Sequence, residues 1–138
     1  MAVITRKLKV RTAGNCDMIN ITEQVADTLA ETKLTDGTVT VFVPGATGGL
    51  STIEYEPGLI QDVPELLDRL IPPGPYHHDQ TWHDNNGHSH LRATLMGPSL
   101  VVPFVNKALT LGTWQQIVFI DFDTRGRSRE LILQFIGE

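Results

Sequence analysis

The stretch QQIVFIDFDTRGRSRELILQFI, residues 115–136, decides the fold of this chain. Its two flanks, Gln115–Asp123 and Arg129–Ile136, are rich in β-branched and aromatic residues, which is typical of strands. Between them Thr124–Arg127 is a polar segment with a glycine, and it predicts the turn of a hairpin. We therefore expect the chain to end in two paired antiparallel strands.

Earlier segments continue this β-rich pattern. Short runs of β-branched and apolar residues predict further strands at Val3–Val10, Thr38–Val43, Leu50–Tyr55 and Ser99–Val105. No internal repeat or low-complexity tract separates these runs. They are therefore expected to belong to one β-rich unit.

Two helices interrupt the strands. Thr22 can cap the first, in which Val25 and Leu29 share one apolar face. The second is expected over about residues 58–70, where Pro64 is acceptable only in the first turn. Together these elements predict an α+β, β-rich fold of antiparallel sheets in a sandwich-like arrangement with two main helices.

Size and composition favour a single soluble domain over residues 1–138. The net charge of −5 argues against a nucleic-acid partner, because such proteins usually carry a basic face. No apolar run approaches the length of about 20 residues that spans a bilayer, and no secretion signal is recognisable. Cys16 is the only cysteine, so no intrachain disulfide can form. We expect a cytoplasmic protein without a membrane partner.

All five histidines lie in one short segment, together with two aspartates, Asp79 and Asp84. The histidines are His77, His78, His83, His88 and His90. Imidazole is the commonest metal ligand, and it transfers protons near neutral pH. The segment therefore predicts a functional site. The alternative is a solvated loop or a polar interface whose histidines bind nothing.

Asn86-Gly87 is typical of a two-residue hairpin turn. In such a hairpin His88 and His90 would share one face of a strand, and His83 would lie opposite them. Three imidazoles would then reach one divalent ion, such as zinc. A longer loop would bring in His78 instead.

Other candidate residues surround this segment in the sequence. Glu54 and Glu56 would share a strand face and could divide acid and base roles, or simply face solvent. Thr47 belongs to a glycine-rich loop that could cradle an anion or serve only as a turn. Arg92 and Arg129 are candidate phosphate contacts.

Several segments resemble the YjbQ-like family of secondary thiamine-phosphate synthases. They are Tyr76–Asp79, Asp84–Ala93, Leu95–Ser99, Leu111–Gln116 and Arg127–Arg129. The resemblance implies a compact β-rich sandwich with helices, a homotrimer with sites near subunit boundaries, and weak thiamine-phosphate synthase activity. It points to His78 and His90 as site residues. In one departure, Pro44-Gly45 stands where many relatives have His-Thr.

The resemblance leads us to expect an enzyme that joins a pyrimidine diphosphate to a thiazole phosphate and releases diphosphate. A divalent metal, zinc or magnesium, would bind among His78, His83, His88 and His90. Catalytic roles would fall to His78, His90, Asp84 and Glu54. Phosphorylated substrate would contact Arg92, Thr47, Arg129, Trp82 and Trp114. The alternatives are a metal-dependent hydrolase, and a trimeric protein that binds a metal or metabolite without catalysis.

Overall fold

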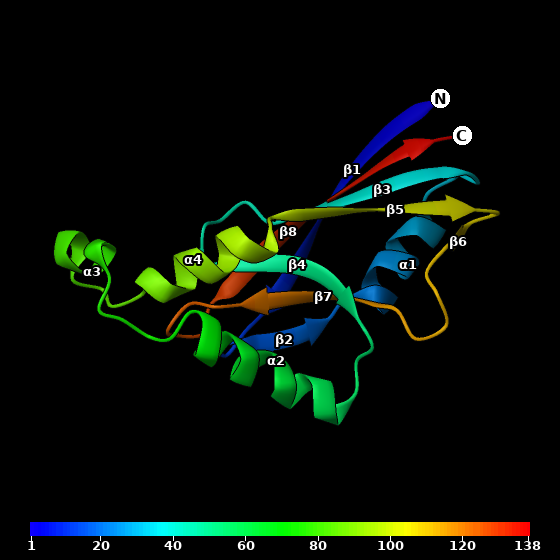
Figure 1. The fold of residues 1–138 in the computed structure, drawn as a ribbon. Helices are drawn as coiled ribbons and strands as arrows, with labels where there is room; N and C mark the ends of the chain where they lie inside the picture. Colours follow the sequence, from blue (N-terminus) through cyan, green and yellow to red (C-terminus); the bar gives the residue numbers. More distant parts are fainter.

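A computed structural model describes all residues, 1–138, and arranges the strands in two antiparallel sheets (Figure 1). The larger sheet has the strand order β1-β8-β3-β5-β6. In that order its strands are Ala2–Arg11, Ser128–Gly137, Gly37–Phe42, Ser99–Val105 and Ala108–Leu109. The smaller sheet has the order β2-β7-β4, formed by Asp17–Asn20, Gln116–Asp121 and Gly48–Ile53. The expected α+β class and sandwich-like packing of sheets are confirmed.

Strand β7 is the centre of the molecule, because both of its faces are buried. Ile117 and Phe119 pack into the main core cluster, which also contains Leu131 and Leu133 of β8. The alternate residue Val118 belongs to a second buried cluster, beneath the helices on the other side of the small sheet. A strand that is apolar at successive positions is typical of this double burial. The order of layers is therefore large sheet, small sheet, helices.

The expected hairpin at the end of the chain is wrong. β7 pairs with β2 and β4, whereas β8 pairs with β1 and β3 in the other sheet. The Phe122 N–H donates to the Thr47 carbonyl at 2.9 Å, and the Thr12 N–H donates to the Arg127 carbonyl at 2.9 Å. These hydrogen bonds hold the segment that crosses from β7 in the small sheet to β8 in the large sheet. The polar segment after β7 is thus a crossing between layers.

Helix α1, Thr22–Glu31, is confirmed, and its Val25 and Leu29 are fully buried in the main cluster. Thr22 is not its N-cap, because Ile21 takes that place without a side-chain hydrogen bond. The Thr22 hydroxyl instead donates to Asn20 Oδ1 at 2.7 Å and accepts the Ile117 N–H at 2.8 Å. Thr22 therefore joins α1 to the small sheet.

Helix α2, Pro57–Leu70, is also confirmed, but Pro64 lies in its interior and not in the first turn. The Glu56 carboxylate caps the helix by accepting the N–H groups of Gly58 and Leu59. Proline removes one intrahelical hydrogen bond. The helix continues because Leu67, one turn later, is buried in the second cluster.

Two further helices replace the expected hairpin around Asn86-Gly87. These are α3, His77–Trp82, which projects from the body of the molecule, and α4, Gly87–Met96, which lies on the small sheet (Figure 1). The buried residues of α4 include His88 with Arg92, and Ser89 with Ala93. The spacing of four residues in each pair is helical. However, His88, Ser89 and Arg92 are polar, so the buried face of the helix does not appear as an apolar stripe in the sequence. The strand prediction failed for this reason.

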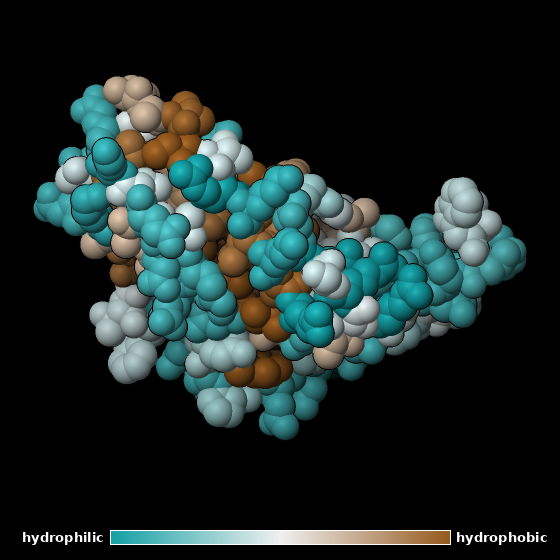
Figure 2. All heavy atoms as spheres, turned by 180° about the vertical axis from the view of Figure 1, so that it is seen from behind, coloured by the Kyte–Doolittle hydropathy of each residue, from teal (hydrophilic) through white to brown (hydrophobic).

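The outward face of the large sheet carries exposed apolar side chains. Val3 is 62% exposed, Val101 58% and Val105 52%. The view from behind shows a band of exposed apolar residues between hydrophilic residues (Figure 2). No helix is long and apolar enough to cross a membrane.

Candidate functional site

Asp79 ties the start of α3 to the start of α4. Its Oδ2 accepts the Tyr76 N–H and its Oδ1 accepts the Gly87 N–H, each at 3.0 Å. The hydrogen bond from Tyr76 is the main cause that lowers the pKa of Asp79. Both carboxylate oxygens are thus engaged with backbone donors. They fix the short helix α3, and with it the neighbouring His78.

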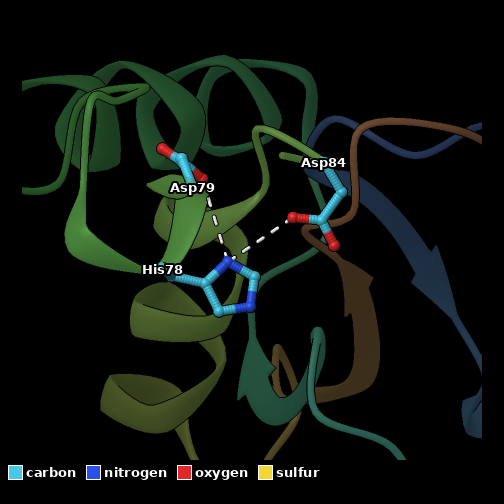
Figure 3. A group of neighbouring side chains, drawn as sticks. All are labelled: His78, Asp79 and Asp84. Carbon is cyan, nitrogen blue, oxygen red and sulfur yellow. Dashed lines mark ion pairs between the residues drawn. The ribbon is translucent and has the colours of Figure 1, made fainter. Parts of the chain in front are cut away.

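His78 and Asp84 face each other across the bend that joins α3 to α4 (Figure 3). His78 Nδ1 lies 3.5 Å from Asp84 Oδ1 and 3.8 Å from Asp79 Oδ1. These three residues form the one group of His, Cys, Asp or Glu side chains whose ligand atoms lie within 4.8 Å of one another. His78 Nδ1 is buried and has no hydrogen-bond partner. It is therefore available to share a proton or an ion with Asp84.

His90, one turn into α4, lies against His78. The two ring centroids are 4.4 Å apart, with 44° between the ring planes. His90 also borders a hollow of about 340 Å³ between α4 and the loop after β3, lined mostly by small residues. We call His78, Asp84 and His90, together with the adjacent Asp79, the His78 site.

Behind the His78 site, Arg129 holds the ends of several strands together. Its guanidinium donates to both oxygens of Asp121 at 3.0 Å, to Asp123 at 3.2 Å and to the Thr47 hydroxyl at 3.0 Å. Burial disfavours the charged form of Arg129, but the two aspartates outweigh burial and raise its pKa. Thr47 and Arg129, both predicted substrate contacts, therefore belong to one internal network.

Asp123 extends this network toward Asp84. It is 3% exposed, and it pairs with Arg127 at 3.0 Å. Burial opposes the ionisation of Asp123, but hydrogen bonds from Thr124 and Asn86 and the nearby arginines outweigh burial and lower its pKa. A hollow of about 320 Å³ opens here, and no hydrophobic residue lines it. Its lining consists of Asp84, Asn86, Asp123, Thr124, Arg125 and Arg127.

The convergence of His83, His88 and His90 expected from a hairpin is not observed. His83 ends α3 in a left-handed conformation with φ 58° and is exposed. His88 and His90 are two residues apart on a helix, so they point in different directions. His88 is 7% exposed, and burial is the main cause that lowers its pKa, followed by the charge of Arg92. The structure instead brings His78 and His90 together.

Arg92, predicted to contact phosphate, is 5% exposed and is engaged inside the fold. Its guanidinium donates to the Ile71 carbonyl at 2.8 and 3.0 Å, to Asp68 at 3.0 Å and to the Cys16 thiol at 3.1 Å. Burial is the main cause that raises the pKa of Cys16. Arg92 thus fastens the end of α2 to α4, and phosphate would have to break these bonds.

Glu54 and Trp114 lie at the opposite end of the small sheet from the His78 site. In the β4–β7 pairing, Ile53 is opposite Gln116, and Gly48 is opposite Asp121. Glu54 and Trp114 border a separate hollow of about 360 Å³. Glu56, which was paired with Glu54, caps α2 instead. Trp82 is 70% exposed at the end of α3. Within one chain these residues are not assembled with Arg129 and Thr47.

Sequence reasoning missed Asn86 and Asp123. Asn86 was assigned only to a turn, yet its buried side chain lies between Asp84 and Asp123. Asp123 was assigned to the end of a strand. The signal was a pair of acids in an otherwise apolar run, Asp121 and Asp123, because buried acids require partners. The arginines that follow them are those partners.

The family model described as UPF0047 protein YjbQ-like matches residues 6–138. A UPF0047 protein of Archaeoglobus fulgidus is 41% identical over 129 residues, which cover 93% of this chain and 98% of that protein. One of Methanothermobacter thermautotrophicus is 36% identical over 139 residues, with 100% and 95% covered.

Solved structures agree with these sequence matches. A YjbQ-like protein of unknown function from Sulfolobus solfataricus P2 superimposes with a TM-score of 0.93 at 28% identity, covering 99% of both chains. A hypothetical protein from Aeropyrum pernix K1 gives 0.91 at 34% identity, covering 98% of this chain and 99% of that chain.

These relatives correct the functional expectation. They carry family names without an activity, and one solved structure is described as having unknown function. The expected thiamine-phosphate synthase activity is therefore wrong as a property of the family, and the hydrolase alternative has no support among them. The match over residues 6–138 and the 41% identity establish a narrower conclusion. The chain belongs to the UPF0047 family of YjbQ-like proteins.

Proposed function

We propose that this protein binds a divalent metal ion at the His78 site. The observation that carries the proposal is the buried, unpartnered Nδ1 of His78, which lies 3.5 Å from Asp84 Oδ1. Buried polar atoms nearly always have partners, so an unpartnered one beside a carboxylate suits a missing ligand. His78 and Asp84 would hold the ion. His90 is the next candidate, because its ring lies beside that of His78.

The donor set favours zinc over magnesium. Imidazole nitrogen suits zinc and related transition metals, whereas magnesium prefers oxygen ligands and keeps several waters. Asp79 is a weaker candidate ligand, because both of its oxygens already accept backbone N–H groups. Asp79 positions His78 instead. A zinc ion bound here would supply Lewis acidity and would lower the pKa of a bound water.

The proposal is tested by isothermal titration of metal-free protein with zinc. His78→Ala is expected to weaken zinc binding by at least about tenfold, because a nitrogen ligand is removed. His77→Ala is the matched control, because His77 is the exposed neighbour in the same helix and should leave affinity unchanged. Equal zinc affinity in wild type and His78→Ala, or no zinc binding by wild type, would contradict the proposal.

We further propose that this protein is an enzyme, and that the His78 site is where it acts on a phosphorylated small molecule. The support is the polar hollow next to Asp84, where Arg125 and Arg127 offer donors suited to phosphate oxygens. The same titration, repeated with inorganic phosphate on zinc-loaded protein, checks this extension. Lack of phosphate binding, or equal binding by Arg125→Ala, would count against it.

The protein is also proposed to be a cytoplasmic homotrimer. The exposed apolar side chains on the large sheet support assembly, because soluble monomers rarely expose large apolar patches. The single cysteine, Cys16, is buried beside Arg92 and forms no disulfide, which is compatible with a reducing compartment. The oligomeric state is tested below, and localisation is checked by cell fractionation.

A further inference from the structure

The His78 site connects two separate hollows. Asp84 borders the polar hollow of Arg125 and Arg127, and His90 borders the hollow of about 340 Å³ between α4 and the loop after β3. His78 is the contact between them, because its Nδ1 lies 3.5 Å from Asp84 Oδ1 and its ring centroid lies 4.4 Å from that of His90. We call the second space the His90 hollow; besides His90 it is lined by Gly45, Ala46, Gly48, Ala93, Thr94 and Pro98.

The His90 hollow exists because the residues around it have small side chains or none. Gly45 and Ala46 lie on the loop after β3, Gly48 begins β4, and Ala93 lies on α4. Gly48 cannot carry a side chain, since a Cβ there would lie 2.6 Å from a ring carbon of Phe119. The wall at this point is therefore backbone, and the space beside His90 stays open.

The lining of the His90 hollow suits a compact, uncharged group. His90 is its only ionisable side chain, and it contains no Phe, Tyr or Trp ring on which a nucleobase could stack. The Ala46 N–H has no acceptor within the chain, whereas the Thr94 hydroxyl already donates to the His90 carbonyl at 2.9 Å. The hollow therefore offers a free backbone donor to an oxygen such as that of a hydroxyl group.

We infer that the ligand of the His78 site is a phosphate ester of a short, hydroxylated carbon chain, with its phosphate at Arg125 and Arg127 and its chain in the His90 hollow. This inference rests on the proposed function and names the class of its substrate. The two contacts of His78, with Asp84 and with His90, bring the hollows close enough for one small molecule to occupy both. A nucleotide does not match this lining, because its base would find no ring to stack on.

Calorimetric titration of zinc-loaded wild-type protein with three probes tests the class of ligand. Glycerol 3-phosphate is expected to bind about tenfold more tightly than inorganic phosphate, because its carbon chain adds contacts in the His90 hollow. AMP is expected to bind no more tightly than inorganic phosphate, because the hollow offers its base no stacking partner.

Two variants narrow the His90 hollow and leave the metal ligands in place. In Gly45→Leu the nearest atom to the new Cβ would be 3.9 Å away, so the fold accepts the side chain. Ala46→Leu enlarges the neighbouring exposed side chain. At least one of them should lower the affinity for glycerol 3-phosphate to that for inorganic phosphate, with the affinities for zinc and phosphate unchanged. Gly112→Leu is the matched control, because Gly112 is exposed, its Cβ would lie 3.7 Å from the nearest atom, and it lines neither hollow.

Three results would overturn the inference and leave the zinc and phosphate sites intact. Glycerol 3-phosphate could bind no more tightly than inorganic phosphate, AMP could gain as much affinity as glycerol 3-phosphate, or neither Gly45→Leu nor Ala46→Leu could lower the affinity for glycerol 3-phosphate. The absence of zinc binding or of phosphate binding by wild type would instead overturn the proposed function, and the inference with it.

Discussion

At the scale of single residues, this protein depends on buried polar groups that are satisfied by other buried polar groups. Asp121 is fully buried, and Arg129 binds both of its oxygens. Breaking such a pair costs several kcal/mol, because the remaining charge has no water to replace its partner. His78 Nδ1 differs from these groups, since nothing within the chain completes it. His88 Nδ1 and Ser89 Oγ also lack partners, so it is the carboxylate of Asp84 beside His78 Nδ1 that distinguishes this site.

His88 gives a prediction about pH. Its pKa is lowered by burial and then by Arg92, and the acids Asp79, Asp68 and Asp123 only partly offset this. Below pH 6.5, the ordinary pKa of histidine, the side chain of His88 is therefore protonated in the unfolded chain but stays neutral in the folded protein. The free energy of unfolding should fall as pH drops from 6.5 toward 5, by up to about 1.4 kcal/mol per pH unit from this residue.

Urea denaturation at several pH values measures this slope. His88→Asn should reduce the slope between pH 6.5 and 5, because the group that resists protonation is gone. Exposed His77→Asn should keep the slope of wild type. If His88→Asn and wild type lose stability in parallel, His88 is not the cause.

At the scale of elements, the site is built where α3 meets α4. The approach is close because Gly87 has no side chain: a Cβ there would lie 2.9 Å from Tyr76 Cβ and 3.2 Å from Asp79 Oδ1. The same glycine donates its N–H to Asp79. Gly87 is thus required for the contact between the two helices, whereas the sequence suggested a tight turn.

Gly87→Ala distinguishes helix propensity from packing. Propensity alone predicts that alanine stabilises a helix by about 1 kcal/mol. The contact with Tyr76 predicts the opposite, a loss of about 1–3 kcal/mol in the free energy of unfolding. Gly45→Ala is the control, because the nearest atom to its Cβ would be 3.9 Å away. Chemical denaturation of both variants decides the sign, and a stabilised Gly87→Ala would refute the packing argument.

Most elements were predictable where the pattern of burial matches the pattern of hydrophobicity. Strands β1, β3, β4 and β5 and helices α1 and α2 lie close to their predicted ranges. α4 was missed because His88, Ser89 and Arg92 occupy its buried face. α3 was missed because none of its residues is buried, so it has no apolar face to detect. The hydrophobic pattern cannot reveal a helix whose buried face is polar.

At the scale of the whole molecule, three layers leave one surface without a cover. Helices α2 and α4 protect the small sheet, and α1 packs into the main core. The outward side of the large sheet retains Val3, Val101 and Val105. Val101 of β5 is paired with Thr40 of β3, the middle strand of that sheet. We expect this face to be buried between subunits.

Val101→Lys is expected to convert a trimer to monomers, because a buried interface does not tolerate an unpaired charge. Native mass spectrometry or sedimentation measures the assembly directly. Gln24→Lys on the exposed surface of α1 should remain trimeric, as wild type should. A monomeric wild type would refute the assembly itself, and a trimeric Val101→Lys would show that the interface lies on another surface.

The sequence by itself determined the fold class, the family and the segment that carries the site. The fold class and the segment follow from local quantities: alternation of apolar residues, helical spacing, and the concentration of histidines between residues 77 and 90. The family followed from the resemblance of motifs such as Asp84–Ala93. Only the tertiary structure decided which imidazoles meet, that β7 and β8 part into different sheets, and that Asn86 lies between Asp84 and Asp123. Such contacts depend on how layers pack and on which buried polar groups find partners, and neither is a property of neighbouring residues alone.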